Sequence, residues 1–280
     1  MVASSTIDES NKLASRNSGR RTNPLRSNLS AEAMCAAAPT APSDERAVTR
    51  QSAQLPAFAP LLEELEIAGW SSHRRLLSGN FHDWLLLEGR RLMVIVGQAV
   101  GTESLDPVEA ALAAQGAWAA VRAHAHHVSD AGALLSLVGR SLWSLPSGGT
   151  QINLAVAIVD TAEGNASLAV AGDCLAWTIR AAATEALAVR QPSLGAAADF
   201  AYQSHLVQLS LRERLLLVAD DPQQRSAKLA SQIAASFSQL DAESHRRMIA
   251  TDAVALARQS FDEIADGTCS PASIVAVRRR

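Results

Sequence analysis

The chain has 280 residues, of which 48% are hydrophobic and 19% are charged, a composition that supports one large hydrophobic core but not two. Its formal net charge is −3, so it lacks the excess of basic residues that nucleic-acid-binding surfaces require. Nucleic acid is therefore not an expected partner.

Cysteine usage and hydropathy indicate the compartment. Cys35, Cys174 and Cys269 are widely spaced and form no CxxC pair or Cys/His cluster suited to zinc, which is typical of a reducing environment. No stretch approaches the roughly 20 apolar residues that span a bilayer, and the polar N-terminus lacks the apolar segment of a signal peptide. We therefore expect a cytoplasmic protein that does not enter a membrane.

The N-terminal segment differs in composition from the rest of the chain. Residues 1–55 are rich in Ser, Ala, Asn, Arg, Thr and Pro and contain no aromatic residue. Such a segment cannot bury enough apolar surface to fold, so it predicts a disordered tail. Apolar runs begin at about residue 56, and we expect one folded domain over residues 56–280.

The first part of this domain has the pattern of strands. An apolar run at 61–70 is followed by two more, at 81–87 and 92–96, which flank the turn signal Glu88-Gly89. The second and third runs predict a β-hairpin. Its second strand lacks alternation, which indicates that both of its faces are buried.

Two helices are expected after the hairpin. Pro107 begins an Ala- and Leu-rich segment that predicts a helix to about residue 127, and Asp130 can cap a second helix that ends near residue 145. Strand-like runs follow at 152–160, 167–171, 175–179, 206–209 and 214–219. Helical patterns at 226–238 and 242–265 and a last strand at 273–277 complete the chain. Helices inserted between runs of strands indicate an α+β fold with antiparallel sheets.

Two segments carry motifs that resemble those of a known family. Residues 78–84 read Ser-Gly-Asn-Phe-His-Asp-Trp, and residues 94–101 read Val-Ile-Val-Gly-Gln-Ala-Val-Gly. The first resembles GGDFYDW and the second resembles LVVGDVSGHG, which are motifs of the metal-dependent (type 2C, PPM) serine/threonine phosphatases of the SpoIIE-like branch. Further similar segments follow the family order, at 65–68, 153–160, 169–173, 209–221 and 273–278. The resemblance covers about residues 57–280.

The resemblance implies a fold and a chemistry. The fold is a four-layer α-β-β-α sandwich of two mainly antiparallel sheets. In this family, two Mn²⁺ or Mg²⁺ ions lie between the sheets and activate a water molecule for in-line attack on a phosphate ester. The substrates in the regulatory branch are serine- or threonine-phosphorylated signalling proteins.

The residues at the implied metal positions differ from the family pattern. The resemblance puts ligand aspartates at four positions, of which only Asp220 is an aspartate here. The others are Asn80, Gln98 and either Ser270 or Pro271. An amide offers one uncharged carbonyl oxygen and cannot bridge two cations with two anionic oxygens. We therefore expect a degenerate site with no metal cofactor, and we assign no catalytic residue.

Three further carboxylates lie near these positions and could compensate. They are Asp83, in the first motif, Asp173, where the family has histidine, and Asp221, next to Asp220. The sequence thus predicts a catalytically inactive pseudophosphatase of signal transduction that binds a protein partner, such as a Ser/Thr-phosphorylated protein. The alternative is an active Mn²⁺- or Mg²⁺-dependent serine/threonine phosphatase with a rearranged site.

Overall fold

The computed structural model describes residues 42–72, 77–101, 105–144, 149–180, 184–187, 191–220, 226–264 and 272–280. The strands are β1 (Leu65–Ser71), β2 (Asn80–Leu87), β3 (Arg91–Val100), β4 (Gln151–Asp160), β5 (Asn165–Ala171), β6 (Leu175–Ile179), β7 (Thr184–Ala186), β8 (His205–Gln208), β9 (Arg214–Asp220) and β10 (Ala272–Arg279). The helices are α1 (Pro42–Gln54), α2 (Pro107–Ala125), α3 (Ala131–Trp143), α4 (Ser226–Ser238), α5 (Ala242–Arg247) and α6 (Ala250–Ile264).

The described strands form two five-stranded sheets in which every neighbouring pair is antiparallel. One sheet has the order β1-β10-β9-β6-β7, and the other has the order β2-β3-β4-β5-β8. The expected hairpin is confirmed as β2 and β3. Its turn contains Gly89 and Arg90 with φ values of 73° and 58°, the positive values that a tight hairpin turn between twisted strands requires.

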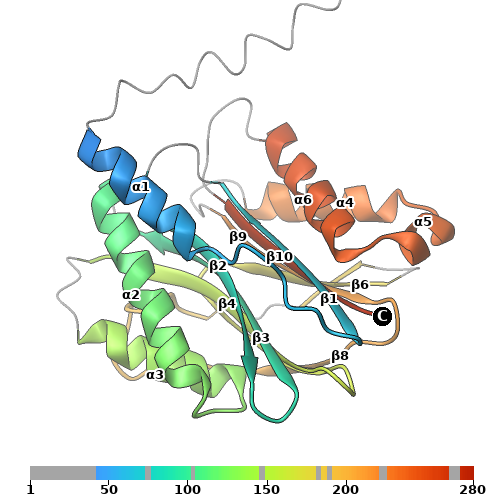
Figure 1. The fold of residues 1–280 in the computed structure, drawn as a ribbon, viewed down its shortest axis with the longest axis horizontal. Helices are drawn as coiled ribbons and strands as arrows, with labels where there is room; N and C mark the ends of the chain where they lie inside the picture. Colours follow the sequence, from blue (N-terminus) through green and yellow to red (C-terminus); the bar gives the residue numbers. More distant parts are fainter. Residues whose placement is uncertain are drawn as a thin grey trace, which may run out of the picture. The chain divides into compact units, whose positions relative to one another are not determined.

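Three apolar clusters define four layers. Val94 and Ala155 of one sheet pack against Leu217 and Val275 of the other, so the two sheets face each other. The outer face of the β2–β8 sheet packs against α2 and α3, and the outer face of the β1–β7 sheet packs against α4 and α6 (Figure 1). The expected α-β-β-α sandwich is confirmed.

Helix α3 is attached to its sheet through its N-cap. The Asp130 carboxylate accepts hydrogen bonds from Ala133 N at 2.8 Å, from Ser167 Oγ at 3.0 Å and from Ser204 Oγ. Burial acts to raise the pKa of Asp130, but these hydrogen bonds outweigh it and lower the pKa below its ordinary value. The predicted role of Asp130 as a helix cap is confirmed.

The structure differs from the sequence-based expectation at its N-terminal boundary. Helix α1 lies within the segment for which composition predicted a disordered tail, and residues 1–41 lie outside the described residues. Tertiary contacts account for this helix. The Gln51 amide donates a hydrogen bond to the Ser78 carbonyl and accepts one from Ser78 N at 3.0 Å. These bonds attach α1 to the segment just before β2.

The expected helix over 242–265 is also interrupted, because α5 ends at Arg247 and α6 begins at Ala250. The buried Arg214 guanidinium causes the break by binding the carbonyl oxygens of His245 and Met248, with Nε 3.1 Å from the latter. Burial lowers the pKa of Arg214 to about 10. A helix that continued through these residues would need the same carbonyl groups for its own hydrogen bonds.

Among the described helices, none combines the length and the apolar character needed to cross a bilayer.

Candidate functional site

Three buried amide side chains form a row across the β2–β3–β4 ribbon. In the antiparallel register, Gln98 of β3 lies opposite Asn80 of β2 on one side and opposite Asn153 of β4 on the other. Directly opposite residues in antiparallel strands share a face of the sheet, with Cβ atoms about 5 Å apart. The exposed fraction is 1% for Asn80, 4% for Gln98 and 1% for Asn153. We call Asn80, Gln98 and Asn153 the amide row.

The amide row faces the space between the two sheets. Side chains on a strand alternate between its two faces, and Val96 and Ala155, two residues along from Gln98 and Asn153, belong to the apolar cluster between the sheets. The row therefore lies at the end of that cluster, where β2, β3 and β4 come together and polar side chains replace apolar ones.

Much of the hydrogen-bonding capacity of the amide row is unused. Both side-chain atoms of Asn80, Oε1 of Gln98 and Nδ2 of Asn153 are buried and have no hydrogen-bond partner within the part of the chain that the structure describes. Asn153 Oδ1, by contrast, accepts a hydrogen bond from Ser193 Oγ at 2.7 Å. Unpartnered buried polar groups are uncommon in folded proteins and mark sites of ligands, ions or ordered water.

The turn after β5 makes room for Asn153. Gly172 has φ of 70°, and a Cβ atom at this position would lie only 1.8 Å from Asn153 Oδ1. Gly172 N also donates to the Gln191 carbonyl at 2.9 Å, which fixes the loop that carries Ser193. Only glycine fits here, because any side chain would displace the amide.

A second polar group connects the two sheets beside the row. Ser71 Oγ of β1 lies 2.7 Å from His82 Nδ1 of β2 and 2.6 Å from Ser273 Oγ of β10. The His82 ring covers Gly69, where a Cβ atom would lie 2.6 Å from the ring. The contact between Ser71 and His82 joins the edge strands β1 and β2 of the facing sheets, and Ser273 of β10 extends it.

Asp83, by contrast, faces away from the amide row. It lies an odd number of residues after Asn80 and therefore on the opposite face of β2, where its carboxylate is 2% exposed. Oδ2 accepts from Arg122 Nε at 2.6 Å and from Trp118 Nε1 at 2.8 Å, and Oδ1 accepts from Arg122 Nη2 at 3.1 Å. The guanidinium also lies 4.8 Å from the centre of the Trp118 ring. Asp83 thus joins β2 to α2.

We predict that Asp83→Asn lowers the free energy of unfolding by about 2–3 kcal/mol, because charge-assisted hydrogen bonds from Arg122 and Trp118 are lost. It should leave the response of the protein to Mn²⁺ unchanged. Chemical denaturation with and without Mn²⁺ measures both effects. Asp199→Asn is the control at an exposed aspartate and should change stability by less than about 0.5 kcal/mol. A variant of normal stability with an altered Mn²⁺ response would instead indicate that Asp83 is a ligand.

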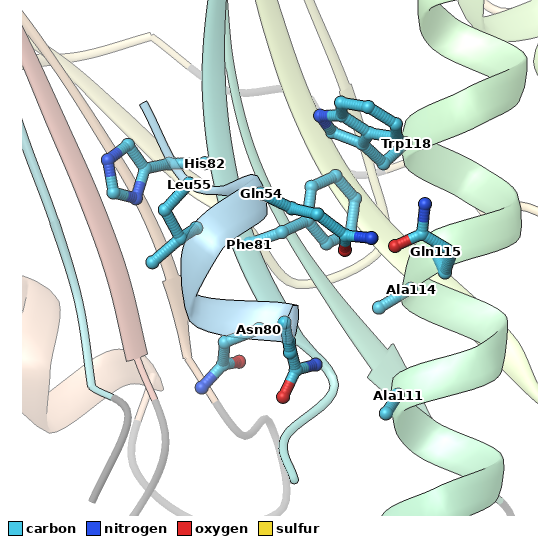
Figure 2. A pocket seen from close by; sticks show the side chains of 10 residues that line it. Gln54, Leu55, Asn80, Phe81, His82, Ala111, Ala114, Gln115 and Trp118 are labelled. Carbon is cyan, nitrogen blue, oxygen red and sulfur yellow. The ribbon is translucent and has the colours of Figure 1, made fainter. Parts of the chain in front are cut away.

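A pocket opens beside the start of the amide row. It is lined by Gln51, Gln54 and Leu55 at the end of α1, by Asn80, Phe81 and His82 of β2, and by Ala111, Ala114, Gln115 and Trp118 of α2. Its space is about 310 Å³, part of it open to solvent. Figure 2 shows the end of α1 in front of β2, with the Gln54 and Gln115 side chains extending toward each other from α1 and α2.

Comparison with protein families agrees with this architecture. Residues 88–271 match the family described as Stage II sporulation protein E (SpoIIE). The chain belongs to the SpoIIE family. This confirms the resemblance found in the sequence and identifies the domain as one of the PPM-type, metal-dependent serine/threonine phosphatase fold. Comparison with curated proteins gives no significant match.

Solved structures show the same fold. The SiaA-PP2C domain of Pseudomonas aeruginosa has a TM-score of 0.62 and 18% identity, over 84% of this chain and 94% of that one. The RsbU and RsbW domains of Rv1364c from Mycobacterium tuberculosis have a TM-score of 0.58 and 20% identity, over 79% of this chain and 61% of that one. The PP2C phosphatase domain of SpoIIE from Bacillus subtilis, with a fragment of its regulatory domain, has a TM-score of 0.56 and 11% identity, over 77% of this chain and 61% of that one. The chain thus spans 61% of the last two structures.

The described donor atoms of the amide row do not fit a pair of Mn²⁺ or Mg²⁺ ions. At the two predicted ligand positions that the structure describes in full, Asn80 and Gln98 present neutral amides, and the neighbouring Asn153 is a third. Hard divalent cations require anionic oxygen ligands that balance their charge. Within the described ranges, no group of three or more His, Cys, Asp or Glu side chains is placed to hold a metal.

The structure describes the remaining predicted ligand positions only in part. Asp220 ends β9 and its backbone pairs with Ala272, but its side chain is not among those described. Asp221, Ser270 and Pro271 also lie outside the described residues. Asp173 follows Gly172 in the β5–β6 turn and is partly buried. Whether Asp173, Asp220 and Asp221 compensate for the amides stays a prediction.

The sequence did not reveal two parts of this site of the SpoIIE-family domain. Asn153 was not identified, because its position beside Gln98 depends on the β3–β4 register, which joins segments about 50 residues apart. The link through His82, Ser71 and Ser273 likewise joins three strands from both sheets. The available signal was weak: Asn153 is a lone polar residue at the start of an apolar run.

Proposed function

We propose that this SpoIIE-family domain does not hydrolyse phosphate esters and acts by binding a protein partner. The observation that carries the proposal is the pair of neutral amides, Asn80 and Gln98, side by side on β2 and β3, where the sequence resemblance predicts ligand aspartates. A carboxylate at either position would give two anionic oxygens to bridge two cations, whereas an amide gives one neutral oxygen.

Electrostatics argues for loss of the metal pair. Two unit charges about 4 Å apart interact by roughly 4 kcal/mol at an effective dielectric near 20. The attraction between a carboxylate and a divalent cation at the same distance is twice as large. The Asn80 and Gln98 positions contribute no such attraction. The one described carboxylate on β2, that of Asp83, is already neutralised by Arg122 on the other face of the sheet.

The fold does not depend on a metal for its integrity. Apolar side chains fill the space between the sheets, and Ser71, His82 and Ser273 hold the sheets together at the end where the amide row lies. A scaffold of this kind can present a binding surface without catalysing a reaction. The partner that the family suggests is a Ser/Thr-phosphorylated signalling protein, and the domain would act in regulation.

The first test measures metal binding and activity on the full chain. We expect no saturable Mn²⁺ or Mg²⁺ binding by calorimetry, and no metal-dependent hydrolysis of p-nitrophenyl phosphate or phosphoserine peptides. The rival function, an active phosphatase with a rearranged site, predicts turnover that requires Mn²⁺ and that Asp220→Ala abolishes. That result would overturn the proposal.

A charge-restoring variant tests the physical cause. In Asn80→Asp/Gln98→Asp, two buried carboxylates lie opposite each other, so we expect a lower Tm in EDTA and a rise in Tm when Mn²⁺ is added. The wild-type Tm should be the same in EDTA and in Mn²⁺. The control is Asn165→Asp, which adds a negative charge at an exposed position and should not create a Mn²⁺ response. A Mn²⁺-dependent Tm in the wild-type protein would contradict the stated cause.

Partner binding is tested by affinity purification of the full chain from its own cells, once in EDTA and once in Mn²⁺. We expect the same protein partner in stoichiometric amount under both conditions, because binding does not rely on a metal. The purified partner, phosphorylated and unphosphorylated, should then bind the full chain in a defined complex by calorimetry. Absence of any stoichiometric partner would remove the support for a binding function.

A further inference from the structure

The amide row has a balanced set of free hydrogen-bonding groups. Asn80 Oδ1 and Gln98 Oε1 are unpartnered acceptors, and Asn80 Nδ2 and Asn153 Nδ2 are unpartnered donors among the described residues. Exchanging O and N in either Asn leaves both kinds of group in the row. All belong to side chains that are at least 96% buried, so bulk solvent does not satisfy them.

This balance determines what kind of ligand the row can hold. A cation would be attracted by the two carbonyl oxygens but repelled by the two NH₂ groups, and an anion would meet the opposite arrangement. A water molecule donates two hydrogen bonds and accepts two, so it matches both kinds of group without introducing a charge. The three amides and the hydroxyl groups of Ser71, Ser193 and Ser273 are not ionisable, so these six side chains supply no charge that would favour an ion.

The pocket beside α1 gives such a ligand a way in. Asn80 is both part of the row and part of the pocket lining, and His82 next to it also lines the pocket. The lining includes no Asp, Glu, Lys or Arg, and three of its residues besides Asn80, namely Gln51, Gln54 and Gln115, are amides (Figure 2). The pocket has room for a water molecule between polar groups.

We propose that Asn80, Gln98 and Asn153 bind ordered water between the two sheets, where the family resemblance places the metal pair. The site has exchanged cationic ligands for a neutral one, and the water completes the hydrogen bonding of the buried amides. The proposed water site rests on the same neutral amides as the proposed function, but different measurements overturn each of them. Phosphatase activity overturns the proposed function, whereas the occupant of the amide row decides this inference.

A crystal structure of the full chain tests the site directly. Crystals are soaked separately in Mn²⁺ and in Tl⁺, and anomalous data are collected for each. We expect density within hydrogen-bonding distance of at least two of the three amides that refines as water and has no anomalous signal. An anomalous peak there would identify a cation site. Direct contact of the same amide atoms with one another or with another side chain, such as Asp220, would also overturn the inference.

A double-mutant cycle tests the site in solution. Asn80 and Asn153 lie on β2 and β4, with β3 between them, so without a shared ligand their effects on stability should be independent. We expect Asn80→Ala/Asn153→Ala to lower the Tm by clearly less than the sum of the single variants, because either substitution already disrupts the water. The control pair, Asn80→Ala with the exposed Asn165→Ala, should be additive. Additivity in both pairs would overturn the inference.

Discussion

The pairing register of β2, β3 and β4 places three side chains side by side in the space between the sheets, and the chemistry of the domain depends on their identity. Antiparallel pairing leaves no freedom in this respect, since Asn80, Gln98 and Asn153 must share a face once the strands are hydrogen-bonded. Carboxylates in such a row repel each other and need cations to neutralise them. Amides do not, and the sheets can close without a counter-ion.

Uncharged amides and hydroxyl groups recur among the described side chains at the polar end of the inter-sheet space. Ser71, His82 and Ser273 connect the facing sheets through short hydrogen bonds, and Ser193 binds the Asn153 amide in the space that Gly172 leaves open. Asp83, the carboxylate of β2, lies on the opposite face and is paired with Arg122 of α2. The uncharged amides and the ion pair of β2 thus lie on opposite faces of the sheet.

Local patterns were sufficient to predict most of the architecture. The hairpin of β2 and β3 followed from Glu88-Gly89 between apolar runs, and the start of α3 followed from Asp130 as a cap. The interruption between α5 and α6 could not be predicted, because it depends on Arg214 from a distant strand. Helix α1 was missed for the same reason: composition describes the isolated segment, whereas Gln51 is held by Ser78 in the folded domain.

The candidate site shows the same division between local and distant information. Asn80 and Gln98 could be identified from motifs, whereas Asn153 became visible only through the strand register. The orientation of Asp83 was available in principle, since an odd spacing from Asn80 places the two residues on opposite faces of one strand. Proximity along the chain makes Asp83 a possible compensating carboxylate, whereas alternation along β2 directs it toward Arg122 of α2.

This alternation has an evolutionary consequence. Along β2, Asn80 and His82 face the space between the sheets, while Phe81 and Asp83 hold α2 against the sheet. Successive residues of one short strand thus serve two independent tasks, and a substitution on one face leaves the contacts of the other intact. A domain built in this way can lose, exchange or regain its reactive groups by point mutation while its folding stays under separate selection.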